Sequence, residues 1–190
     1  MGTRDRLIDA AEQAIHRFGI SGATTKRIAH QAGCSEALLY KHFGNKEELF
    51  LAVLLERMPA LAPALTRLRS NVGQGDVSAN LTTFATAALD FYHKAAAVAG
   101  GVIGDPPLLA GFRDMLAKAE LGPHLPILAL AEILRDEQRG GRIEAGLDAD
   151  AAAWMLMGAC FQRANLTYFV DLPGDDDTWA ATIVDSLVKR

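Results

Sequence analysis

The segment between residues 24 and 46 is rich in side chains that donate hydrogen bonds to phosphate. Thr24 and Thr25 bear hydroxyl groups where a helical pattern begins, and the free N–H groups of a helix N-terminus are a natural phosphate site. Further donors follow in the same segment, namely Tyr40, Lys41, His42 and Lys46. This collection indicates contacts with a polyanion such as nucleic acid.

Charge is distributed unevenly along the 190 residues, although the formal net charge is only −4. Residues 1–46 carry seven basic and four acidic side chains, whereas the remainder carries 12 basic and 19 acidic ones. A basic N-terminal part on an acidic remainder indicates an anionic partner for the first part only. An excess of this size also arises by chance in a short window, so it supports nucleic-acid binding without establishing it.

The same segment has the pattern of two short helices joined by a tight turn. The first helix is expected to start at Thr25 and to bury Ile28, and the turn needs a positive φ that Gly33 adopts at no cost. The second helix is expected to begin after a cap at Ser35 and to end near Phe43. This is a helix-turn-helix arrangement, in which the second helix is placed to enter the major groove of DNA.

Residues at the start of the second helix are candidates for reading base edges. Glu36 can accept a hydrogen bond from cytosine N4, and Ala37 or Leu38 can touch a thymine methyl group. Glu36 alternatively only complements the helix dipole. Lys26 and Arg27 lie in the first turn of the preceding helix, where a positive charge opposes the dipole, so a use outside the helix explains them better.

Residues 23–50, with the sequence ATTKRIAHQAGCSEALLYKHFGNKEELF, resemble the DNA-binding segment of the TetR family of bacterial transcriptional regulators. The matching motifs are TT-x-x-IA at residues 24–29, the Ala-Gly turn at 32–33 and LY-x-HF-x-x-K-x-x-L at 39–49. The resemblance extends over about residues 3–55. The rest of the chain matches only in its length and helix content.

The resemblance implies an all-α homodimer that binds a roughly palindromic double-stranded DNA operator and is released by a small molecule. It implies phosphate contacts by Thr25, Tyr40, His42 and Lys46, base contacts near Lys26, Glu36, Ala37 and Leu38, and additional contacts by Thr24, Arg27, Ser35 and Lys41. Each residue also has an ordinary alternative: Tyr40 and His42 can simply pack, and Lys46 can be a solvated surface lysine. Operator sequence does not carry over, because the family varies at residues 36–38.

Apolar residues recur at helical spacing along the whole chain, and alternating strand patterns are absent. This predicts an all-α fold of about nine helices, with a DNA-binding domain at residues 1–46 and a ligand-binding and dimerisation domain at 47–190. The expected helices cover residues 3–19, 25–32, 35–43, 45–59, 77–99, 108–121, 125–139, 148–170 and 177–187. A Thr3 cap should begin the first helix, Phe18 should face its core, and Gly100–Gly101 should end the helix at 77–99.

Bulky apolar side chains in the later helices are candidates for lining an effector pocket. They are Met58, Phe84, Phe91, Tyr92, Phe112, Met115, Trp154, Met157 and Phe161, with Gln162, Asn165, His93, His124 and Arg163 as possible polar anchors. As a set they suit a small, mostly apolar effector. For any one of them, a place in the ordinary core is the alternative.

The helices expected at residues 148–170 and 175–189 are the candidates for the dimer interface. The first is apolar on too many sides for a helix that has one face in water, and Gly158 allows close approach. Two such helices from each subunit form a four-helix bundle in the family that the chain resembles. A central core helix without a role in dimerisation is the alternative.

Signals for catalysis and for a membrane are missing from the sequence. There is no HExxH, GxSxG, P-loop or GxGxxG motif, so we expect neither an enzyme nor a cofactor or metal site. The longest apolar run, Ala151–Phe161, is too short to span a bilayer, and two cysteines without a CxxC pair fit the cytoplasm. The alternative function is a helical small-molecule-binding protein or enzyme with an idle DNA-binding head.

Overall fold

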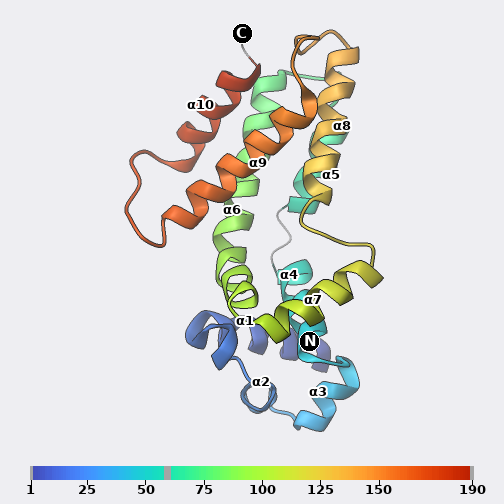
Figure 1. Ribbon diagram of the computed structural model, residues 1–190, viewed down its shortest axis with the longest axis vertical. Helices are drawn as coiled ribbons and strands as arrows, with labels where there is room; N and C mark the ends of the chain where they lie inside the picture. Colours follow the sequence, from blue (N-terminus) through green and yellow to red (C-terminus); the bar gives the residue numbers. More distant parts are fainter. Residues whose placement is uncertain (1, 58–60, 189–190) are drawn as a thin grey trace. The chain divides into compact units, whose positions relative to one another are not determined.

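The structure is a computed structural model that describes residues 2–57 and 61–188 (Figure 1). These residues form ten helices and no strand, which confirms the predicted all-α fold with one helix more than expected. The helices are α1 (Thr3–Gly22), α2 (Thr25–Gln31), α3 (Glu36–His42), α4 (Lys46–Arg57), α5 (Leu61–Ser70), α6 (Val77–Ile103), α7 (Pro106–Lys118), α8 (Leu125–Arg139), α9 (Ala149–Leu166) and α10 (Asp176–Val188). The additional helix is α5, which lies within residues 59–75, where Pro63 and the segment Ser70–Gly75 obscured the helical pattern.

The described residues pack as two compact units. The first combines residues 2–57 with 94–122, and the second combines residues 61–93 with 123–188, so that α6 contributes to both. In the first unit α1 packs against α2, α3 and α4, and α4 packs against α7. The predicted boundary at residue 46 concerned function and stays a prediction. In packing terms α4 belongs with the three helices that precede it.

The first helix differs from the prediction at both ends. It begins at Thr3 with Gly2 as its cap residue, and Asp5 accepts a hydrogen bond from the Gly2 N–H at 3.0 Å. Gly19 interrupts the helical geometry as expected, with φ of 68°, but one more turn follows before the helix ends at Gly22. Phe18 does not face the core: it is 42 % exposed, and the guanidinium groups of Arg17 and Arg27 lie over its ring.

The expected end of α6 at Gly100–Gly101 is wrong, because the helix continues to Ile103. A Cβ atom at Gly101 would lie 2.4 Å from the Cβ of Ile20, so this glycine allows α6 to approach the last turn of α1. The helix ends where Asp105, which precedes Pro106, adopts an extended conformation. A proline disfavours the helical conformation in the residue before it, and this is the stop signal here.

The second unit has a single apolar core to which α5, α6, α8, α9 and α10 contribute. The helix α9 packs against α8 and α10, and its inward side includes Ala153, Leu156 and Cys160, all almost fully buried. Among the described residues no single helix is long and apolar enough to cross a bilayer.

Candidate nucleic-acid interface

Helices α2 and α3 form the expected helix-turn-helix in the first unit. Thr24 caps α2 by accepting a hydrogen bond from the Arg27 N–H, and Ser35 caps α3 by accepting one from the Leu38 N–H. Between the helices Gly33 has a φ of 69°, a conformation that only glycine adopts without strain. The short-range signals in the sequence therefore specify this turn correctly.

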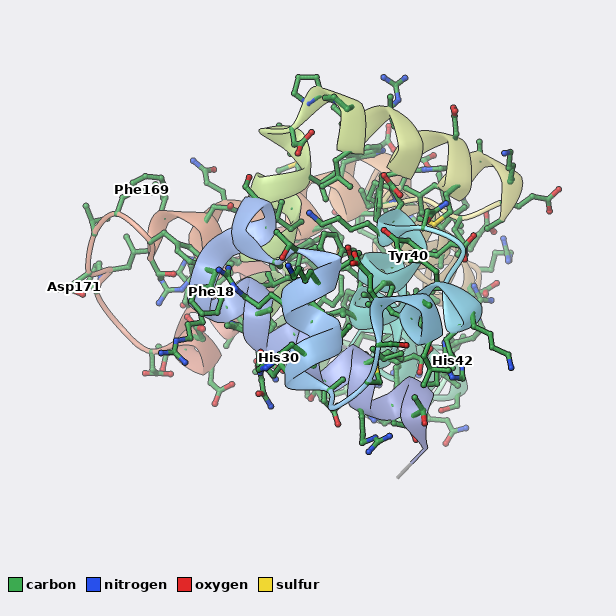
Figure 2. The ribbon with its side chains drawn as sticks, turned by 90° about the horizontal axis from the view of Figure 1, so that it is seen from below. Phe18, His30, Tyr40, His42, Phe169 and Asp171 are labelled. Carbon is green, nitrogen blue, oxygen red and sulfur yellow. The ribbon has the colours of Figure 1, made fainter. Side chains whose placement is uncertain are left out.

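Most of the predicted DNA-contacting residues present their side chains to solvent. Tyr40 and His42 on α3, and His30 on α2, are visible on the side of this unit seen in Figure 2. The exposed members of the predicted set are Thr24, Lys26, Arg27, Ser35, Glu36, Ala37, Tyr40, Lys41 and His42, while Thr25, Leu38 and Lys46 are half-buried. An exposed strip of hydroxyl and cationic groups along α3 is what a phosphate backbone requires.

Thr25 and Glu36 are joined by a hydrogen bond that the sequence did not indicate. The Thr25 hydroxyl donates to Glu36 Oε1 at 2.5 Å, and the Tyr40 hydroxyl donates to Thr25 Oγ1 at 3.4 Å. Glu36 and Tyr40 are four residues apart on α3 and therefore share one face of the helix. Thr25, from α2, thus bridges the first turn of α3 to the next. No local sequence signal reveals a contact between residues 11 positions apart.

Arg27 contributes to the corner between α1 and α2 in this conformation. Its guanidinium group lies 4.2 Å from the centre of the Phe18 ring and donates a hydrogen bond to the Gly22 carbonyl. A guanidinium over an aromatic face is a favourable cation–π contact. The side chain that was predicted as an additional DNA contact therefore also holds the end of α1.

Lys46 is held partly inside the first unit. Its ammonium group donates to the Ile20 carbonyl at 3.2 Å and lies 5.0 Å from the centre of the Phe50 ring. Burial lowers the pKa of Lys46, and the negative charges of Asp105 and Glu47 oppose that shift. An ammonium group has three donors, so the bond to Ile20 leaves two for a phosphate.

The comparison with known families decides which family the segment with helices α1 to α4 resembles. Residues 7–53 match the family described as bacterial regulatory proteins, tetR family, and this match contains α2, the turn and α3. The N-terminal segment of the chain, residues 7–53, is a TetR-family segment. The prediction of a DNA-binding transcriptional regulator is confirmed at the level of the family.

Individual relatives agree with this assignment. The HTH-type transcriptional repressor SCO4008 of Streptomyces coelicolor is 43 % identical over 60 residues, which are 32 % of this chain and 31 % of that protein. The HTH-type transcriptional regulator TtgR of Pseudomonas putida is 29 % identical over 97 % of this chain and 91 % of that protein. The strongest identity is therefore confined to about a third of each chain.

A solved structure extends the likeness in fold to the whole chain. The transcriptional regulator FadR from Bacillus subtilis, solved in complex with stearoyl-CoA, has a TM-score of 0.69 and covers 97 % of both chains. Its sequence is only 20 % identical, so the likeness concerns the TetR fold and not the ligand.

The predicted pocket residues that the structure describes are divided between the two units and differ in burial. Phe84 and Met157 are buried in the core of the second unit, whereas Trp154 and Phe161 are 55 % and 47 % exposed. Phe112 and Met115 belong to the first unit, and Met58 lies outside the described residues.

Phe84 lines a cavity of about 70 Å³ between α5 and α6. Gln162 is exposed, and half-buried Asn165 donates to the Phe161 carbonyl.

Three of the predicted aromatic residues do pack together in the second unit. The Tyr92 ring makes edge-to-face contacts with Phe91 and Phe161, each with 5.4 Å between ring centres. Burial raises the pKa of Tyr92 to about 12, and burial likewise raises the pKa of the nearby Cys160 thiol to about 12. A thiol that stays protonated is a poor nucleophile, so Cys160 acts as a small apolar residue.

Two of the predicted polar anchors line a more open cavity of about 340 Å³ between α6, α9 and α10. Arg163, which is only 7 % exposed, donates from Nε to Asp176 at 2.7 Å, and His93 Nε2 lies 3.0 Å from the same carboxylate. Burial acts to raise the pKa of Asp176, but the hydrogen bonds from Arg163 and His93 outweigh it, so this pKa is below its ordinary value. Asp176 therefore neutralises the Arg163 guanidinium group and also occupies His93 Nε2.

We expect Asp176→Asn to lower the melting temperature at pH 7, because it leaves the buried Arg163 without a counter-charge. The native pKa of Asp176 is depressed, so its stabilisation is present above the ordinary value of 3.8 and is lost as the pH falls through the native value. The deficit of the variant should therefore shrink below pH 3.8 in thermal melts. Asp171→Asn, at an exposed carboxylate in the segment that precedes α10, is the matched control. A deficit that is independent of pH would contradict the ion pair.

Proposed function

We propose that the protein is a homodimeric repressor that binds a palindromic operator and is released by a small, mostly apolar effector. The observation that carries this proposal is the exposed helix-turn-helix strip of Tyr40, Lys41 and His42 in a segment of the TetR family. Affinity comes chiefly from Tyr40, His42 and Lys46 on phosphates, and specificity comes from the start of α3. Contacts of this kind make binding strongly dependent on salt.

An apolar face of α9 supports the homodimer. Trp154, Met155 and Phe161 have exposed fractions of 55 %, 61 % and 47 %. Their spacing places them with Gly158 on one side of the helix. Large exposed apolar residues grouped in this way are typical of a protein interface. A two-fold axis through this face presents the same patch from both subunits and makes the two heads equivalent, as a palindrome requires.

Release of the DNA by an effector depends on a difference in the effector's affinity for two states of the protein. An effector shifts the equilibrium only if it binds the state that cannot bind DNA more tightly than the competent state. The half-buried aromatic cluster of Phe91, Tyr92 and Phe161 supports an apolar effector. FadR from Bacillus subtilis, which binds stearoyl-CoA in its solved structure, offers a precedent within the same fold.

Two substitutions separate affinity from specificity. Tyr40→Phe should weaken binding to all DNA sequences by about tenfold, because a hydrogen bond to a charged phosphate contributes roughly 1.5–3 kcal/mol. Glu36→Ala should instead change which bases are preferred. Fluorescence anisotropy on a panel of duplexes at several salt concentrations measures both effects. A Tyr40→Phe variant with unchanged affinity and salt slope would remove Tyr40 from the phosphate contacts.

Selection of bound duplexes from the source organism's genomic DNA, read by sequencing, tests the whole proposal. An enriched palindrome is the expected result, and neighbouring genes then suggest effectors for titration of the complex. The alternative is a helical small-molecule-binding protein or enzyme with an idle head. Absence of enrichment, from folded dimeric protein at low salt, would favour that alternative.

A further inference from the structure

Thr25 has a single hydroxyl hydrogen, and that hydrogen is directed at Glu36 and not at solvent. The Thr25 Oγ1 to Glu36 Oε1 distance is 2.5 Å, which is the short limit for a hydroxyl group that donates to a carboxylate. A threonine hydroxyl donates only one hydrogen bond. Thr25 therefore cannot keep this bond and also donate to a DNA phosphate, in contrast to Lys46 with its three donors.

Tyr40 completes this cluster from the other side. Its hydroxyl donates to Thr25 Oγ1 at 3.4 Å, a long hydrogen bond, and the Tyr40 side chain is 47 % exposed. A bond of this length gives up little free energy when the hydroxyl turns to a phosphate. Redirection of the Tyr40 hydroxyl leaves the shorter Thr25–Glu36 bond intact. The two hydroxyl groups thus have different roles, although both were predicted to contact phosphate.

We propose that Thr25 is a positioning residue that holds the Glu36 carboxylate for hydrogen bonding to cytosine N4 in the major groove. This inference rests on the proposed function, because it concerns how the same head discriminates operator sequences. The carboxylate lies at the first residue of α3 and is exposed, with one oxygen held by Thr25 and the other available to a base. Fixing the rotamer of an exposed glutamate before DNA arrives removes part of the entropy cost of base recognition.

The Glu36 carboxylate also lowers the affinity for operators that place guanine or thymine at the position it faces. Cytosine offers an N4 donor in the major groove, whereas guanine and thymine place acceptors there. A fixed carboxylate beside an acceptor leaves both groups unpaired in a site from which water is excluded, and this is costly. If Glu36 is not held, the side chain can turn to solvent and avoid that cost. Loss of the Thr25 hydroxyl is therefore expected to relax discrimination more than it lowers affinity.

The test compares Thr25→Val, Thr25→Ser and Glu36→Gln with the unmodified protein by sequencing of duplexes selected from a randomised library. The unmodified protein should prefer cytosine about tenfold at one position in each half-site, given the usual strength of such contacts. Thr25→Val should reduce this preference to about threefold or less with an unchanged salt slope, and Thr25→Ser should retain it. Glu36→Gln should shift the same position toward adenine, which glutamine pairs with.

Other results separate the failure of this inference from that of the proposed function. If the unmodified protein enriches no palindrome, the proposed function fails. If it enriches one, and Thr25→Val lowers affinity equally for all sequences, then Thr25 is a phosphate contact and the inference is wrong. An unaltered cytosine preference in Thr25→Val would also overturn it. Thermal melts of each variant verify that α2 is still folded.

Discussion

A protein in which Trp154→Glu and Met155→Glu are combined should be a monomer that binds the operator at least about a hundredfold more weakly. Both side chains are more than half exposed on α9, and neither belongs to the apolar core of the second unit, so charges at these positions leave that core unchanged. In a dimer the same charges would be buried opposite their copies, where like charges without counter-ions are strongly unfavourable. A monomer loses the second half-site, which contributes two to four orders of magnitude in apparent affinity.

Sedimentation equilibrium gives the oligomeric state, and anisotropy on a full palindrome and on a single half-site gives the affinities. The half-site affinity should be the same for the variant and the unmodified protein, because the head is unchanged. Leu128→Glu is the matched control, since this residue on α8 is 47 % exposed and lies outside residues 148–189. A double variant that remains dimeric would place the interface elsewhere.

Neighbouring glycines in α6 should respond in opposite directions to the same substitution. Nothing lies within 4 Å of a Cβ atom at Gly100, so Gly100→Ala should stabilise the helix by about 0.5–1 kcal/mol. A Cβ atom at Gly101 would lie 2.4 Å from the Cβ of Ile20, which belongs to the buried core of the first unit. The backbone must move to relieve this overlap, so Gly101→Ala should destabilise the protein by about 1–3 kcal/mol.

Urea denaturation followed by circular dichroism measures both effects under identical conditions. Each variant is the control for the other, because the substitution, the helix and the gain in helix propensity are the same. Only the contact with Ile20 differs between the two positions. Equal stabilisation by both substitutions would show that α6 does not approach α1 as closely as described here.

Short-range signals were sufficient to predict the helix-turn-helix. Gly33 and Ser35 specify the turn and the start of α3 through interactions within a few residues, and Asn45 caps α4 by accepting from the Glu48 N–H at 2.8 Å. Such interactions depend on local backbone geometry and are therefore readable from the order of the residues. The predicted all-α class follows from the same kind of local periodicity.

Contacts between distant residues were decided by the tertiary structure. The local pattern predicts that Gly101 ends the helix, but in the structure Gly101 lies within α6, where it makes room for the side chain of Ile20. Likewise, the Thr25 hydroxyl donates its hydrogen bond to Glu36 on the next helix. Helix α9 is the clearest case, because its nearly continuous apolar sequence did not separate core from surface. Packing against α8 and α10 buries Met157 and leaves Trp154 exposed, since a helix buries only the face that its neighbours cover.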